Sequence, residues 1–263
     1  MEIKKFHEYS STDIEAIQFF AENGFVVLKD VFKTSEVNSL HHFIEQLFRS
    51  ALGDDISDFS DLLEKNYEGS QLLQWKRVAT RLNHSLALQK LSLAEPLIAF
   101  LQANGLEEPC ISTFPEVRVD MPSDAVYTQP WHQDWRYGQS SINSVTVWAP
   151  MSNLAFETGV PQFAAKTHQC GLWDYEIQKN PRRIVIKKEE LEKLPPYAYS
   201  GNISVGSCII FSQLTVHRSG VNVTNSARLS FQLRYADINC KDFAANGFAV
   251  PKDDALTWAE LPF

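Results

Sequence analysis

A histidine and an aspartate lie two residues apart in the stretch WHQDW, at His132 and Asp134. On a β-strand, side chains at this spacing leave the same face, so one metal ion can bind both. Two histidines and one carboxylate on one face of a metal leave other coordination positions open, an arrangement that suits non-haem Fe(II) oxygenases. Because His-x-Asp alone is common by chance, the prediction requires a second histidine elsewhere in the chain.

Two histidines in the β-rich half of the chain are candidates for this third ligand, His168 and His217. His217 lies in CIIFSQLTVHRSG, after an apolar run that indicates a core strand, and Arg228 follows eleven residues later. Lys179 stands at the same interval after His168, but the surrounding FAAKTHQCGLWD favours a loop. We therefore favour His217.

Arg228 begins a run in which apolar and polar residues alternate, as expected for a strand with one face of each kind. The rigid fork of an arginine matches a carboxylate through two hydrogen bonds. If the polar face lines a cavity, Arg228 can therefore hold a dicarboxylate cosubstrate near the metal. The apolar positions of this run are Leu229, Phe231, Leu233 and Tyr235.

Helices are predicted in the first part of the chain. The first is expected from Thr12 to Asn23, because a capping box begins at Thr12 and Gly24 stands where a terminal glycine belongs. A second is expected over Ser35–Leu52, where apolar residues recur on one stripe, and a third over Pro96–Asn104, with proline in its first turn. Between the first two, FVVLKDVF (Phe25–Phe32) indicates a strand.

Short β-rich runs dominate beyond Pro109, namely ISTF, VRVDM, SVTVW, IVI, CIIF and LSFQLRY. Helices followed by many short strands predict an α+β fold with a mainly β core, shaped as a sandwich or barrel. We expect a single domain over residues 1–263, with a helical part at about 10–105 and a β part at about 106–240.

Composition narrows the class of partner. The formal net charge of −8 argues against binding a nucleic-acid backbone, which needs clustered cations. The N-terminal stretch lacks the apolar core of a secretory signal, and no apolar run reaches membrane-spanning length, so we expect a cytoplasmic protein that binds no membrane. The four cysteines are far apart and are expected to be reduced.

Taken together, these motifs resemble the phytanoyl-CoA dioxygenase-like family of Fe(II)- and 2-oxoglutarate-dependent oxygenases. The likeness covers ENGFVVLKDVF with a helix after it, WHQD, HRSG after an apolar strand, and the interval from His217 to Arg228. The resemblance implies a double-stranded β-helix, a jelly-roll or cupin-like barrel, supported by N-terminal helices. It also implies that His132, Asp134 and His217 bind iron, and that Arg228 and Ser219 hold the distal carboxylate of 2-oxoglutarate.

The reaction implied by this resemblance uses Fe(II), 2-oxoglutarate and O2 to hydroxylate an unactivated C–H bond of a small molecule, releasing succinate and CO2. Related halogenases lack the carboxylate ligand, so Asp134 favours hydroxylation. Trp148 corresponds to a position where the family often has an aromatic near the cosubstrate, although a core indole would explain it equally. Gln129 either lines the site or is a loop amide.

The chain departs from the family pattern at Lys166-Thr167-His168, where the family has a glycine first. Because glycine adopts positive φ easily and lysine does not, the turn is expected to differ here.

A basic segment lies between Gly171 and Gly201. It either meets an anionic or carrier-linked substrate at the barrel mouth or forms a solvated hairpin balanced by nearby glutamates. Its cations are Lys179, Arg182, Arg183, Lys187 and Lys188.

Two other functions remain open from the residues. A cupin-like metal enzyme that does not use 2-oxoglutarate would keep the three ligands but would not need Arg228. A non-catalytic ligand-binding barrel would be expected to have lost a ligand, and none is missing. The sequence does not predict the substrate or the oligomeric state.

Overall fold

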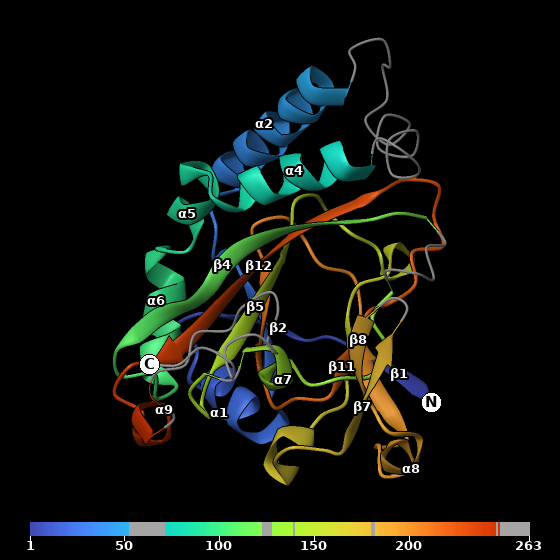
Figure 1. The fold of residues 1–263 in the computed structure, drawn as a ribbon. Coiled ribbons are helices and arrows are strands. Elements are labelled where there is room, and N and C mark those ends of the chain that lie inside the picture. Colours follow the sequence, from blue (N-terminus) through green and yellow to red (C-terminus); the bar gives the residue numbers. More distant parts are fainter. Residues whose placement is uncertain (53–71, 123–127, 139, 180–181, 246, 248–263) are drawn as a thin grey trace.

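The structure is a computed structural model that describes residues 1–52, 72–122, 128–138, 140–179, 182–245 and 247 (Figure 1). Its helices are α1 (Ile14–Asn23), α2 (Thr34–Leu52), α4 (Leu72–Asn83), α5 (Leu86–Leu91), α6 (Glu95–Ala103), α7 (Trp135–Gly138), α8 (Lys188–Leu191) and α9 (Lys241–Ala245). Short 3-10 helices occupy Phe156–Thr158 and Thr167–Cys170. The strands are β1 (Glu2–Lys5), β2 (Glu8–Ser10), β3 (Phe25–Lys29), β4 (Pro109–Asp120), β5 (Val145–Pro150), β6 (Gln162–Phe163), β7 (Tyr175–Lys179), β8 (Arg182–Ile186), β9 (Tyr197–Ser200), β10 (Cys208–Ser212), β11 (His217–Arg218) and β12 (Arg228–Asp237).

Two sheets form the centre of the molecule. The larger has the strand order β2-β3-β10-β5-β12-β4, and the smaller has the order β1-β9-β6-β11. The strands β7 and β8 form a separate antiparallel hairpin. A pair of backbone hydrogen bonds between His132 and His217 adds the WHQD segment to the end of the smaller sheet.

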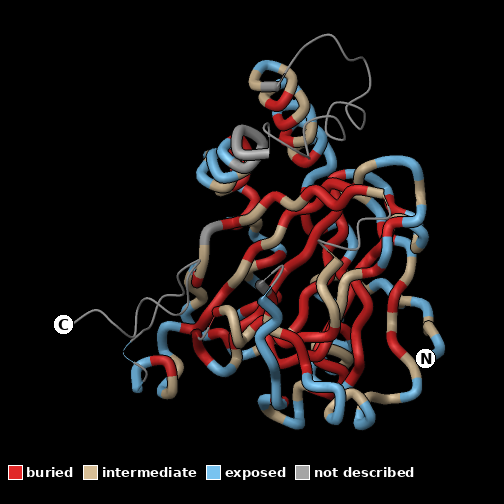
Figure 2. Tube along the Cα trace, turned by 45° about the vertical axis from the view of Figure 1, so that its right-hand side comes forward, coloured by how far each residue is buried: buried red, intermediate tan, exposed pale blue. Residues whose placement is uncertain are grey.

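The larger sheet is covered on both faces, because successive side chains of a strand point to opposite sides. On β3, Val26 and Leu28 pack in a cluster with Val37 of α2, whereas Phe25 and Val27 pack in a second cluster with Phe163 of the smaller sheet. Helices therefore cover one face and the smaller sheet covers the other (Figure 1). Figure 2 shows the buried segments concentrated in the sheets and the exposed ones in the outer loops and helix faces.

The expected α+β class with a mainly β core is confirmed. On β12, the apolar residues of the alternating run lie in the helix-side cluster and Arg228 lies on the opposite face, as the alternation predicted; this face is the one toward the smaller sheet. Within the described residues, the two larger sheets do not close into one continuous barrel. No helix among the described residues has both the length and the apolar character that crossing a bilayer requires.

The helix predictions are confirmed except at one end. The first helix begins at Ile14, and its cap residue is Asp13, so the predicted capping box at Thr12 is wrong. The Thr12 hydroxyl lies 3.1 Å from that of Ser10 instead. At the other end, Gly24 has φ of 80° and donates its N–H to Phe20, as its position predicted.

Candidate metal centre

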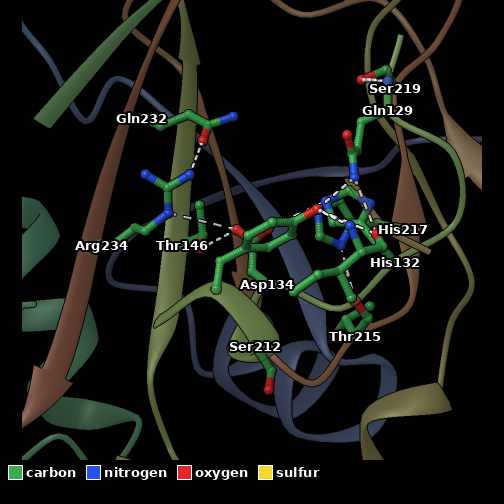
Figure 3. A network of polar contacts seen from close by, with 12 residues as sticks. Gln129, His132, Asp134, Thr146, Ser212, Thr215, His217, Ser219, Gln232 and Arg234 are labelled. Carbon is green, nitrogen blue, oxygen red and sulfur yellow. Dashed lines mark hydrogen bonds and ion pairs between the residues drawn. The ribbon is translucent and has the colours of Figure 1, made fainter. Parts of the chain in front are cut away.

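The side chains of His132, Asp134 and His217 meet at one place, where their potential ligand atoms all lie within 4.8 Å of one another. The Nε2 atoms of the two histidines are 3.3 and 3.6 Å from Oδ1 of Asp134. All three residues are buried. Figure 3 shows the three side chains converging from the WHQD segment and from β11.

Local structure at WHQD differs from the expected strand. Only His132 pairs with a neighbouring strand, while Asp134 directly precedes α7 and accepts the N–H of Tyr137 with its backbone carbonyl. The chain bends here because the Asp134 carbonyl accepts the first hydrogen bonds of α7 and does not pair with a neighbouring strand. The two side chains still converge, but through this turn and not through a shared strand face.

Both histidines are oriented by backbone carbonyls. Nδ1 of His132 lies 2.8 Å from the carbonyl of Pro130, and Nδ1 of His217 lies 2.9 Å from that of Thr215. A proton on each Nδ1 satisfies these contacts and leaves the Nε2 lone pairs free for a metal, as is usual for histidine ligands. Burial, helped by His132, lowers the pKa of His217 to about 3, so its imidazole is neutral at ordinary pH.

Asp134 has partners on its second oxygen. Thr146 donates its hydroxyl to Oδ2 at 2.7 Å, and the guanidinium Nε of Arg234 lies 3.8 Å from the same atom. Burial would raise the pKa of Asp134, but nearby positive charge, including that of Arg234, holds it well below its usual range. An ionised carboxylate with one free oxygen and two imidazoles form a donor set that fits Fe(II).

Aromatic rings surround the two histidines. Phe163 stacks on His217 at 5.7 Å and an interplanar angle of 17°, and Phe211 lies 4.5 Å from the same ring. Tyr137 meets His132 edge-on at 6.0 Å. These rings exclude water from one side of the centre.

The alternative ligand His168 lies elsewhere. Its Nε2 is 3.2 Å from the carbonyl of Ala21 in α1, and Lys179 ends an exposed strand of the hairpin. The structure thus brings His217, and not His168, to His132 and Asp134.

Arg228 is buried beside the centre and has an acidic partner that the sequence did not reveal. Its Nη2 lies 2.7 Å from Asp120, and Asp120 is also 3.3 Å from Arg118. Burial would raise the pKa of Asp120, but Arg228 and Arg118 lower it below its usual value. Arg228 also lies 5.6 Å from the ring centre of Trp148, and its Nε has no hydrogen-bond partner among the described residues. One carboxylate between two arginines leaves positive charge for an anionic cosubstrate.

The remaining predicted site residues lie around one cavity of about 970 Å³ that also contains the three candidate ligands and Arg228. Ser219 and Gln129 bind each other's backbone, since Ser219 N–H donates to the Gln129 carbonyl and Gln129 N–H donates to the Ser219 hydroxyl. The Gln129 amide donates to the Tyr137 hydroxyl at 2.9 Å. Trp148 is both a buried core indole and part of the cavity wall.

The cavity residues that sequence reasoning missed include Glu116 and Arg118 of β4 and Arg234 of β12, and it also missed the buried Thr146 of β5. A signal for Arg234 was present, because it lies on the same polar face of the alternating run as Arg228.

The basic segment contributes structure near the centre more than charge. Within β8, Ile184 exchanges hydrogen bonds with the Tyr137 hydroxyl, and Arg183 donates to the carbonyl of Thr128 at 2.8 Å. Lys179 and Lys187 are exposed, and Lys187 pairs with Asp174 at 3.7 Å. None of the described cations of this segment lines the cavity.

The turn at Lys166 keeps the conformation that a glycine would adopt. Lys166 has φ of 67°, in the left-handed region, so the expectation of a different turn is wrong. Its N–H donates to the carbonyl of Asn23, and its ammonium pairs with Glu22 at 2.6 Å. These contacts hold a backbone conformation that lysine rarely adopts.

The fold and the site together define a class, the non-haem iron and 2-oxoglutarate-dependent oxidoreductases. The family profile of phytanoyl-CoA dioxygenase matches residues 20–230, and the chain belongs to this family. It therefore uses iron, 2-oxoglutarate and O2 and acts on a small-molecule substrate. No curated protein sequence matches the chain.

Solved structures share the fold at low identity. The epimerase SnoN, in complex with Fe3+, alpha ketoglutarate and nogalamycin RO, has a TM-score of 0.59 at 17% identity, covering 85% of this chain and 82% of its own. The carbocyclase SnoK from nogalamycin biosynthesis has a TM-score of 0.58 at 15% identity, covering 94% and 95%. EvdO2 from Micromonospora carbonacea var. aurantiaca has a TM-score of 0.55 at 16% identity, covering 91% and 96%.

Proposed function

We propose that this chain hydroxylates an unactivated C–H bond of a small molecule, with Fe(II) held by His132, Asp134 and His217. The observation that carries the proposal is the convergence of these three buried side chains within 4.8 Å, each with its other polar atoms already bonded to the protein. When bound there, Fe(II) with 2-oxoglutarate activates O2 to oxidise a C–H bond, releasing succinate and CO2.

The protein's part is to bind and orient. Arg228 and Ser219 would hold the distal carboxylate of 2-oxoglutarate, since both line the cavity and the buried Nε of Arg228 has no hydrogen-bond partner in the part of the chain that the structure describes. Trp148, against which Arg228 lies, would pack beside the cosubstrate, and Gln129 would fix the wall through Tyr137. The aromatic rings around His217 keep water from the reacting groups.

We also propose that the two facing sheets are the halves of a jelly-roll, double-stranded β-helix fold and that residues 1–263 form one domain. The shared cluster of Phe25, Trp148 and Phe163 joins the sheets, and the helix-side cluster joins the larger sheet to the N-terminal helices. Both features support one body with one core.

The first test is an anaerobic titration of the metal-free protein with Fe(II) and then with 2-oxoglutarate, recording the visible metal-to-ligand charge-transfer band. We expect the band to appear, to be lost in His217→Ala and to weaken in Arg228→Ala. Iron binding without a band would favour a cupin-like enzyme that does not use 2-oxoglutarate. Failure to bind iron would favour a non-catalytic barrel and would show that the ligands are wrongly assigned.

The type of reaction is tested separately, because SnoN and SnoK are named as an epimerase and a carbocyclase. With labelled O2, hydroxylation places one labelled oxygen atom in the product and one in succinate. A product that gains no oxygen would contradict hydroxylation while leaving the metal assignment in place.

A further inference from the structure

One wall of the cavity is formed by β4, β12, α4 and α5, on the side away from the aromatic core. Ile111 is the one apolar side chain that the described residues of these elements add to the lining, and it is partly exposed. The others carry amide, hydroxyl, imidazole or charged groups, including Asn83, Gln89, Thr113, Glu116, Gln232 and Arg234. The wall therefore offers mainly side chains that can form hydrogen bonds.

Arg234 links this wall to the metal centre. Its Nε lies 3.8 Å from Oδ2 of Asp134, and its Nη2 donates to the Gln232 amide oxygen at 2.6 Å. Figure 3 shows Arg234 and Gln232 on the opposite side of Asp134 from Gln129 and Ser219. A molecule held by Arg234 would thus lie next to the candidate metal ligands, on the side away from Ser219.

The ion pair between Arg234 and Glu116 is loose. Nη1 and Nη2 of Arg234 lie 3.3 and 3.4 Å from the same oxygen of Glu116, whereas a charge-assisted hydrogen bond of this kind is usually about 2.7–2.9 Å. The side chain of Glu116 is 40% exposed. Both groups can therefore accept a ligand as a partner without losing a strong bond to each other.

The backbone is irregular at this point. The ladder between β12 and β4 shifts register on either side of Arg234, so β4 carries extra residues opposite it. Bulges of this kind redirect side chains and are frequent next to active sites. Here they place Thr113 opposite Arg234 and Glu116 opposite Gln232.

We propose that the substrate is a compact polar molecule with both hydrogen-bond donors and acceptors, held beside the metal by Glu116, Gln232 and Arg234. An acyl chain laid on this wall would take the remaining hydrogen-bonding positions of these groups away from water and offer none in return, which is unfavourable. This wall therefore favours a polar group over an acyl chain. The inference rests on the proposed function, because it places the substrate by reference to the iron site.

The test uses the full chain loaded anaerobically with Fe(II) and 2-oxoglutarate, and follows the charge-transfer band as probes are added. One set of probes contains amino acids and polyols, and the other contains dodecanoate and dodecanoyl-CoA. We expect members of the polar set alone to shift the band. A response to the acyl probes, or no response to any polar probe, overturns the proposal.

A matched pair of variants then locates the binding. Glu116→Gln is expected to weaken the binding of a responding polar probe by about tenfold or more, as loss of a hydrogen bond to a charged group implies. Glu22→Gln changes the same group at an exposed ion pair on α1 and is the control. Equal affinities in the two variants overturn the assignment of this wall. Absence of the starting band would instead refute the proposed function, so the two failures are distinguishable.

Discussion

The hydroxyl of Thr146 donates to Oδ2 of Asp134 at 2.7 Å, which leaves Oδ1 facing the Nε2 atoms of His132 and His217. Thr146 is fully buried on β5, so its hydroxyl has a fixed position from which to hold the carboxylate. Oδ2 of Asp134 is therefore held by the protein, and Oδ1 is left to bind the candidate metal.

Thr146→Val should therefore weaken metal binding, because the carboxylate loses the bond that orients it. Changes to groups that position metal ligands typically cost about 10–100-fold in affinity, and we expect about tenfold here. Anaerobic calorimetric titration with Fe(II), or with Ni(II) as a redox-stable substitute, measures the metal affinity of the variant and of the parent protein. Thr146→Ser keeps the hydroxyl and should bind metal almost normally; an unchanged affinity in Thr146→Val would show that Asp134 needs no such support.

Long periodic elements of the fold could be predicted from the sequence, whereas short ones could not. α2 shows a clear apolar stripe over its length, and the alternation in β12 correctly placed Arg228 on the face opposite the apolar residues. The strands β6 and β11 have two residues each, too few to alternate, and exist only because neighbouring strands pair with them. The helices α4 and α5 were not predicted.

The candidate site divides in the same way. His132, Asp134 and His217 could be selected from residue type and spacing, since metal chemistry restricts which side chains can serve. Thr146 and Asp120 could not, because a threonine in a buried strand is ordinary and Asp120 meets Arg228 only through the pairing of β4 with β12. Residues that support the site only through tertiary contacts cannot be recognised from the local sequence pattern.

Asp120→Asn should destabilise the fold. Asp120 lies between Arg228 and Arg118, and the Arg228 side chain is 2% exposed, so removing the carboxylate leaves buried positive charge without compensation. Removing one partner of a buried ion pair costs about 3–5 kcal/mol, and we expect about 3 kcal/mol in urea unfolding. Glu22→Gln, at an exposed pair, should cost less than about 1 kcal/mol, and a similar loss in both variants would contradict the explanation.

Lys166→Gly should stabilise the protein slightly. A non-glycine residue in the left-handed region costs about 1–2 kcal/mol, while glycine loses about 0.5–1 kcal/mol through its greater freedom in the unfolded chain. The exposed pair with Glu22 offsets little of the gain. Thermal unfolding measures the result, and Lys166→Ala, which removes the pair but keeps the strained backbone, should not be stabilised. A lower melting temperature for the glycine variant would show that the turn is not strained.

His168 should make stability depend on pH. Partial burial lowers the pKa of His168 below the usual value of about 6.5, although the hydrogen bond to the carbonyl of Ala21 acts in the opposite direction. The charged groups nearby are Glu22 of α1 and Lys166, which directly precedes the 3-10 helix that contains His168. Below about pH 6.5 the unfolded chain binds a proton that the folded chain resists, so stability falls as the pH falls through this range. In His168→Gln, whose amide can still donate to Ala21, urea unfolding between about pH 5.5 and 8 should show a weaker pH dependence. Identical slopes in the two proteins would mean that His168 is protonated as easily in the folded chain as in the unfolded one.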